Sequence, residues 1–184
     1  MKRLFSLLTA SGLAFAAAST AVAAESGQSC MPIGGVAIPN FFPEGEGKPI
    51  IISATLAGSV QNAAGKILAQ RQTPTGLEMD MEHYFGRDDG GGIHTKDLGI
   101  LTTVPDKPGR YMLEITYHIQ QQDSRGTLKG YGGLFNSYGL VDLRDPNNMV
   151  GLVRYTGEIF STPDGLPFTG AEIAFCGASL RLFN

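Results

Sequence analysis

The sequence predicts an all-β protein built as a single antiparallel β-barrel of about eight strands, preceded by an irregular N-terminal arm. Three observations favour this fold. Apolar and polar residues alternate along several segments, most regularly over 77–85 and 111–120, and a period of two is typical of strands. Gly, Pro, Asn and Asp separate these segments at short intervals. Glycines also recur over 126–139, where they curve a sheet toward closure.

Residues 1–24 have the pattern of a signal peptide and are excluded from the fold. Lys2 and Arg3 form the positive start, an apolar stretch follows over 4–18, and small residues at 21–24 supply a cleavage site. An uncleaved membrane anchor is the alternative, but Ala, Ser, Thr and Gly dilute the apolar stretch. We therefore expect an exported protein, periplasmic or secreted, with no stable membrane anchor.

The charge balance disfavours nucleic acid as a partner. The whole chain has a formal net charge of −3. Loss of Lys2 and Arg3 with the signal peptide lowers the basic count from 14 to 12 against 17 acidic residues, which gives −5. Proteins that bind nucleic acid usually present a basic patch or stripe, and the sequence has no basic run.

Cys30 and Cys176 are the two cysteines of the chain. Lone cysteines in an oxidising compartment usually pair, so we expect a disulfide that ties the N-terminal segment to the last strand. Chain entropy gives so long a loop a stabilisation of about 5 kcal/mol. Two unpaired buried thiols are the alternative. A catalytic thiol is disfavoured because neither cysteine has a nearby His or a CxxC partner.

The chain after the signal peptide divides into an arm and a barrel domain. The arm is expected over 25–48, where prolines and glycines interrupt any periodicity. The barrel domain is expected over 49–184. Its first strand is predicted over 50–60, and a turn over 62–65 leads to a return strand over 66–72. The sequence KILAQRQ of that return strand also suits a short helix.

The next segments alternate more regularly. One face of the 77–85 segment carries Leu77, Met79, Met81, His83 and Phe85, and the other carries Glu78, Asp80, Glu82 and Tyr84. After a glycine-rich loop over 86–92, a strand is expected over 93–104. The sequence PDKPG at 105–109 then forms a turn.

Two further strands, the glycine-rich ribbon and a terminal strand complete the predicted barrel. One face of the 111–120 segment carries Tyr111, Leu113, Ile115, Tyr117 and Ile119. A turn over 123–126 leads into the glycine-rich ribbon, and DPNN at 145–148 forms another turn. The strand over 150–160 places Val153, Tyr155 and Ile159 on one face. A last strand is predicted over 170–183.

The ribbon GTLKGYGGLF at 126–135, followed by Gly139, resembles the glycine-rich hairpin of allene oxide cyclase-like and dirigent-like barrels. The resemblance covers roughly 92–158. Leu134 stands where those families commonly have a glycine, and no catalytic carboxylate is matched. The resemblance implies an eight-stranded barrel with an apolar cavity, often in dimers or trimers, so a homo-oligomer is expected. It also implies cyclisation or radical coupling that is steered without a cofactor, by shaping the substrate.

Apolar faces that point inward would carry several polar-tipped side chains into the barrel. A small barrel holds one ligand in such an interior. The candidate ligand-binding residues are therefore His83, Tyr111, Tyr117, Tyr155, Met79 and Met81. Among these, His83 is suited to acid–base chemistry near neutral pH. The alternative is that these side chains only fill the core.

Other kinds of site have less support. The residue types of a metal site are present in His83, His94, His118, Glu82, Asp88, Asp89 and Asp97, but no HxH, HxxE or HExxH spacing occurs. The turn over 142–148 offers oxygen ligands without EF-hand spacing, and turn formation explains these residues better. No GxSxG or phosphate-binding loop occurs. No metal or cofactor is expected, and no catalytic residue is assigned.

These observations favour an exported barrel that holds a small apolar or aromatic molecule. The alternative is a cofactor-independent cyclase or isomerase of the allene oxide cyclase-like kind, with His83 and the tyrosines orienting the substrate. A structural or surface-interaction module is a third hypothesis, based on the acidic outer faces and the glycine-rich loops.

Overall fold

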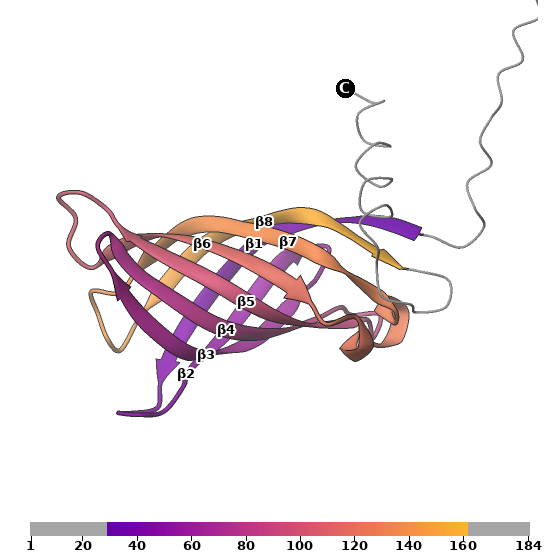
Figure 1. The fold of residues 1–184 in the computed structure, drawn as a ribbon, viewed down its shortest axis with the longest axis horizontal. Coiled ribbons are helices and arrows are strands. Elements are labelled where there is room, and N and C mark those ends of the chain that lie inside the picture. The colour runs from indigo at the N-terminus through magenta and orange to yellow at the C-terminus, as the bar shows by residue number, and fades with distance from the viewer. Residues whose placement is uncertain (1–28, 162–184) are drawn as a thin grey trace, which may run out of the picture.

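In the computed structural model, eight antiparallel strands form one closed barrel (Figure 1). The structure describes residues 29–161; the predicted signal peptide, the strand predicted over 170–183 and Cys176 lie outside this range. The strands are β1 (Ser29–Pro43), β2 (Ile50–Gly58), β3 (Asn62–Thr73), β4 (Gly76–Gly86), β5 (Gly92–Thr103), β6 (Arg110–Ile119), β7 (Tyr131–Asp142) and β8 (Val150–Ser161). Each pairs with its sequence neighbours, and β1 pairs with β8 to close the barrel. The predicted fold class is confirmed.

Strand β1 corrects the prediction of an irregular arm over 25–48. Its first part pairs with β8, and from Gly35 onward it also pairs with β2. Proline lacks the N–H that a ladder needs, so it is tolerated only where a ladder bond is absent. Pro32 precedes the pairing with β2, and Pro39 lies where pairing with β8 is interrupted between Ala37 and Asn40. The prolines therefore coexist with a strand.

The predicted turn at 62–65 is also wrong, because β3 already begins at Asn62. The chain reverses instead just after Gly58, whose φ of +140° is a backbone conformation that side-chain-bearing residues rarely adopt. Gly65 lies within the strand and faces the barrel interior. The segment KILAQRQ is extended, so the strand interpretation is confirmed and the helix alternative is not.

The predicted inward faces of 77–85 and 111–120 are confirmed by their burial. Aromatic rings from three strands meet in this core. The ring centroids of Phe85 and Tyr117 are 5.3 Å apart, and those of Tyr117 and Phe135 are 4.4 Å apart. Such pairs contribute about 0.5–1.5 kcal/mol beyond the area they bury. They join β4, β6 and β7 across the barrel interior.

The connection between β6 and β7 contains two short 3₁₀ helices, η1 (Gln121–Asp123) and η2 (Gly126–Leu128). It is attached to β5 through a reciprocal pair of backbone hydrogen bonds between Gly92 and Arg125, at 3.1 and 2.9 Å. The Ser124 hydroxyl donates to the carbonyl oxygen of Tyr131 at 2.6 Å. These bonds hold the connection against one end of the barrel.

The outer face of β4 is ionic. The acidic side chains there pair with β3, where Arg71 lies 2.6 Å from Asp80 and Lys66 lies 3.1 Å from Glu82. Exposed pairs of this kind contribute little to stability. Within 29–161, no helix is long and apolar enough to cross a membrane.

Candidate functional site

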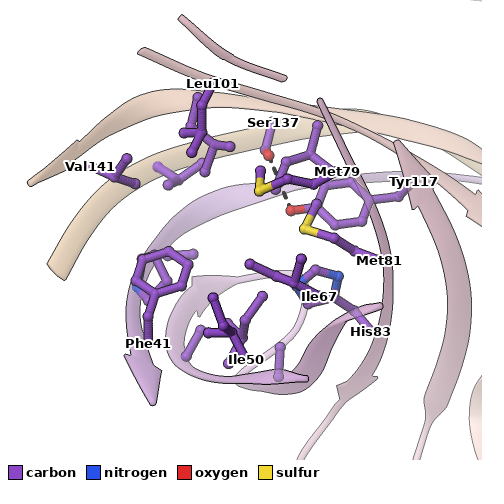
Figure 2. Close-up of a pocket in the computed structure, with 18 of the residues that line it drawn as sticks. Phe41, Ile50, Ile67, Met79, Met81, His83, Leu101, Tyr117, Ser137 and Val141 are labelled. Atoms are coloured by element: carbon purple, nitrogen blue, oxygen red, sulfur yellow. Dashed lines mark hydrogen bonds between the residues drawn. The ribbon is translucent and has the colours of Figure 1, made fainter. Parts of the chain in front are cut away.

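The barrel encloses a cavity of about 190 Å³, to which all eight strands contribute side chains. Most of the lining is aliphatic or aromatic. The polar-tipped residues of the lining are Gln70, His83, Tyr117, Ser137 and Tyr155. Figure 2 shows His83 and Met81 projecting into this space from β4, and Tyr117 from β6. An apolar cavity with a few converging polar groups is the usual form of a small-molecule site.

The two ends of the cavity differ. At the end next to the 3₁₀ connection, Val60, Ile93 and Leu128 are almost completely buried, with 1, 2 and 1 % of their surface exposed. At the opposite end, Phe41 and Leu143 line the cavity but are only half-buried. These side chains lie beside the β1–β2 and β7–β8 loops. As formed by residues 29–161, the cavity is therefore closed at one end and accessible at the other.

His83 lies on β4 in the cavity wall, with only 5 % of its surface exposed. Its ring stacks on Phe85 at a centroid distance of 5.7 Å and meets Tyr117 edge-on at 5.5 Å. Gly65 faces His83 from β3, and a Cβ at that position would collide with the imidazole Cδ2 and lie 2.6 Å from the carbonyl oxygen of Glu82. The imidazole is thus packed on three sides.

Asp97 fixes the remaining edge of the imidazole. Its Oδ2 lies 2.6 Å from His83 Nδ1, and its side chain is fully buried. From the sequence, Asp97 is a candidate only as a metal ligand, and its pairing with His83 is not predicted. The signal is present in β5, where Ile93, Thr95, Asp97 and Leu101 share one face and are all buried. A period of two along that segment places the carboxylate inside the barrel.

The pairing determines the hydrogen-bonding roles of His83 Nε2 and Asp97 Oδ1. An ionised carboxylate only accepts hydrogen bonds, so Nδ1 of His83 is the donor and the lone pair of the neutral ring lies on Nε2. Nε2 has no hydrogen-bond partner within 29–161, but it is not completely enclosed and stays accessible from open space. Asp97 Oδ1, in contrast, is enclosed and has no partner among the described residues.

Tyr117 and Ser137 form the second polar group of the cavity. Their hydroxyls lie 3.1 Å apart, as the dashed line in Figure 2 shows. Burial raises the pKa of Tyr117 far above its usual value, the hydrogen bond from Ser137 opposes this change, and the charge of Asp97 adds to it. The Tyr117 hydroxyl therefore stays protonated and available as a donor.

The structure places the two remaining candidate tyrosines differently. The Tyr155 ring lines the cavity, but its hydroxyl lies 3.4 Å from both the N–H and the carbonyl oxygen of Val60. A Cβ at Gly35 or Gly58 would approach that hydroxyl to 2.7 or 2.8 Å. Tyr155 therefore closes the cavity floor. Tyr111 is half-buried, packs against the core and is not part of the lining.

Met79 and Met81 both line the cavity, as the alternation predicts. Their methyl groups lie over Gly99 on β5, where a Cβ would come within 2.5 Å of Met81 Cε and 3.0 Å of Met79 Cε. Unbranched thioether side chains adapt their shape easily. This wall of the cavity can therefore fit ligands of different outline.

Gln70 lines the cavity because of a β-bulge that the sequence analysis does not predict. Ile67 pairs with Met81, but Ala69 rather than Leu68 pairs with Asp80. The extra residue shifts the alternation of β3, so that Gln70 turns inward. Nothing in the local composition marks the position of this bulge.

Of the other residues proposed for a metal site, His94 and Glu82 are neighbours, with Nε2 of His94 3.6 Å from a Glu82 carboxylate oxygen. The structure brings no three His, Cys, Asp or Glu side chains of 29–161 into a metal-binding group. His94 Nδ1 lies 2.8 Å from Asp123 on the outside of the barrel, and His118 is exposed on β6. At the 142–148 turn, Asp142 is paired with Arg144 at 2.6 Å.

Cys30 lies near the start of β1, opposite Phe160 of β8. Its predicted partner is outside the described residues, so the disulfide stays a prediction. The chemical groups of the cavity are thus one imidazole–carboxylate pair and one pair of hydroxyls in an apolar wall. The chain matches no known protein-family model, no curated protein and no solved structure.

Proposed function

We propose that this protein binds a small apolar or aromatic molecule inside the barrel. The observation that supports the proposal is the cavity, which is closed at one end, lined mainly by aliphatic and aromatic side chains, and accessible at the other end. Each Å² of apolar ligand surface removed from water contributes about 25 cal/mol. His83 and the Tyr117–Ser137 pair would orient a ligand through its polar atom.

We also propose that this binding takes place outside the cytoplasm. The support is the signal-peptide pattern of residues 1–24 together with two cysteines suited to pairing. Ligands that an exported barrel meets there arrive from the medium or the cell envelope. A half-buried apolar rim at the open end of the cavity suits their entry.

Native mass spectrometry of protein purified from its own source tests the binding function. We expect the purified protein to retain a molecule small enough to fit the cavity of about 190 Å³. In a second step, the purified protein is titrated with the bicyclic hydrocarbon tetralin by calorimetry. Saturable binding of one tetralin per barrel is the expected outcome, and the absence of both a retained molecule and tetralin binding would contradict the proposal.

A cofactor-independent cyclase or isomerase is the second candidate function. The specific observation in its favour is the buried His83–Asp97 pair, because its open Nε2 offers an acid–base group to a bound molecule. The expectation from the allene oxide cyclase-like and dirigent-like resemblance points the same way. Conversion of the retained molecule by the purified protein would distinguish the enzyme from a carrier.

A further inference from the structure

We propose that the cavity is the active site of a proton-transfer isomerase for small apolar ketones, in which His83 is the base and Tyr117 binds the carbonyl oxygen. The inference rests on the proposed binding function and deepens it by naming the reaction and the substrate class. It follows from two groups that face the same cavity: the imidazole of His83 and the ring of Tyr117 have centroids 5.5 Å apart.

The His83 imidazole has the arrangement of a positioned base. Asp97 holds Nδ1, the ring of Phe85 stacks on one face, and Gly65 leaves room at the Cδ2 edge. Nε2 is left without a partner among the described residues and accessible. Imidazole exchanges protons near neutral pH, which is the range in which a general base is most effective.

Asp97 acts as a positioning residue through His83. Buried polar atoms nearly always have hydrogen-bond partners, so a buried pair that served only the fold would be expected to satisfy both carboxylate oxygens. Asp97 Oδ1 has no partner within 29–161. The negative charge of the carboxylate can therefore stabilise the imidazolium cation that forms when Nε2 takes up a proton.

The two hydroxyls supply the second polar group of the site. When Ser137 donates to the Tyr117 oxygen, the Tyr117 O–H is free to donate to a ligand oxygen in the cavity. Donors in a water-poor cavity stabilise a developing oxyanion far better than donors in water. The raised pKa of Tyr117, which is due first to burial, keeps this donor protonated.

The substrate class follows from what this chemistry requires. Histidine is too weak a base to remove a proton from an unactivated carbon, so the carbon must adjoin a carbonyl group. No Lys or Arg of the described chain lines the cavity, so it offers no cation to a carboxylate or phosphate. The aliphatic and aromatic lining favours an uncharged ketone with a hydrocarbon frame.

The reaction balances without a co-reactant. The C–H bond next to the carbonyl breaks and an N–H bond forms at His83 Nε2, while the electron pair moves through the new C=C bond to the oxygen bound by Tyr117. In the return step, the carbonyl reforms and Nε2 delivers its proton to the same carbon or to a conjugated one. Delivery to the conjugated carbon shifts a double bond, which is an isomerisation with no net oxidation.

Deuterium exchange into α-tetralone tests the inference, because exchange reports the breaking and re-forming of that C–H bond. In D₂O, the protein should accelerate deuterium uptake next to the carbonyl above the buffer rate. His83→Gln should slow this uptake at least ~100-fold, a loss typical for a general base. His118→Gln, which changes an exposed histidine on the outside of β6, should leave it unchanged.

Calorimetry with α-tetralone and its hydrocarbon analogue tetralin separates binding from chemistry. Tighter binding of α-tetralone is expected, and Tyr117→Phe should remove the difference. In Asp97→Asn, exchange should fall and ¹⁵N NMR should show the His83 proton moved from Nδ1 to Nε2, a change that a merely structural role would not produce. Circular dichroism verifies that each variant is folded.

The possible failures are distinguishable. If neither compound binds, this inference is overturned, and the proposed binding function is overturned with it when the purified protein also retains no small molecule. If both compounds bind but the wild-type protein does not accelerate exchange, proton transfer is overturned and binding stands. If folded His83→Gln exchanges deuterium as fast as the wild type, the assignment of His83 as the base is wrong. If His83→Gln does not fold, Asp97→Asn takes its place, and exchange at the wild-type rate in that variant contradicts the assignment of the pair.

Discussion

The packing around His83 depends on the absence of a side chain at Gly65. A methyl group at Gly65 would overlap the imidazole and lie 2.6 Å from a backbone oxygen of β4. We expect Gly65→Ala to cost about 1–3 kcal/mol of unfolding free energy, the usual range for overpacking a core. It should also displace the ring from Asp97. Urea denaturation and the ¹⁵N NMR signals of His83 measure the two effects.

Gly34 supplies the matched control for that substitution. It lies on β1, and a Cβ there would meet no atom closer than 3.3 Å. Gly34→Ala should therefore change the unfolding free energy much less and leave the His83 signals in place. If both variants lose the same stability, general strand strain rather than the imidazole explains the requirement for glycine at 65.

The buried tyrosines predict how stability depends on alkaline pH. Burial raises the pKa of both Tyr117 and Tyr155 in the folded protein. A raised folded pKa favours the protonated state, so its contribution is complete below the unfolded value of about 10 and is lost as pH rises above it. Urea denaturation between about pH 8 and 11 should show the unfolding free energy falling above about pH 10.

Replacing one buried hydroxyl tests this assignment. Tyr117→Phe should flatten the alkaline fall, while Tyr138→Phe, which changes a side chain that is 51 % exposed on β7, should leave it intact. The Tyr117 variant should also lose about 1 kcal/mol at neutral pH, because the Ser137 hydroxyl is left without its partner. An unchanged alkaline slope in Tyr117→Phe would contradict the prediction.

Alternation alone predicts which side chains of β4, β6 and β8 enter the barrel. His83, Tyr117 and Tyr155 do line the cavity. Alternation does not identify the partner of each polar tip, because the partner lies on another strand or loop whose position is fixed only on folding. Asp97 beside His83 and Val60 beside Tyr155 are the two examples.

Among the elements, β3 carries the feature that most affects the cavity rim. Leu68 is the extra residue of its bulge and is 54 % exposed, with Ile67 and Ala69 paired normally on either side. Deletion of Leu68 should close the ladder without moving any other pair. We expect the variant to fold and to lose about 1 kcal/mol or less, as surface changes usually do. Thermal and urea denaturation measure this.

Deletion of Ala64 is the contrasting control. Ala64 lies in the regular part of β3, so its loss shifts the residues between it and the bulge by one place. A shift of one residue turns each side chain to the other face of the sheet, which drives Lys66 into the apolar interior. An unpaired buried charge costs about 3–5 kcal/mol. Equal stability of the two deletions would show that the bulge is not where the pairing places it.

Contacts between strands explain why the first strand and the first turn are mispredicted. Prolines and glycines argue against a strand when each is read locally, but β1 places Pro32 and Pro39 at gaps in its ladders. Those gaps arise from the pairing of β1 with β2 and with β8, and β8 lies at the other end of the described chain. Likewise, glycine is common in turns, but Gly65 lies in a strand, where its missing side chain leaves space for His83 of the facing strand.

For the whole molecule, closure and an accessible interior have the same origin. Eight antiparallel strands close without an edge because β1 pairs with β8, and a barrel of this size leaves room for one small molecule. Closure was predictable because many short alternating strands need it to remove their edges. An apolar interior was expected too, but whether it is open or filled was not predictable, because its volume depends on how small side chains such as Ala37, Ala54 and Ala63 meet in the interior.

Those small side chains lead to a prediction about the molecule as a whole. Ala54 lines the cavity on β2, between Pro39 of β1 and Ala63 of β3. Ala54→Leu adds three carbons to an apolar interior, and each buried methylene contributes about 0.8 kcal/mol. The variant should therefore be up to about 2 kcal/mol more stable than the wild type, and it should bind tetralin at least tenfold more weakly because the space is taken.

Ala57→Leu makes the same chemical change on the outer face of β2, where the side chain is exposed. It should alter neither the unfolding free energy nor tetralin binding by a measurable amount. Urea denaturation and calorimetry on the two variants thus compare the same three added carbons inside and outside the barrel. Gains in stability are commonly opposed to function where a site depends on open space. Tight tetralin binding by Ala54→Leu would place the binding site elsewhere than in the barrel.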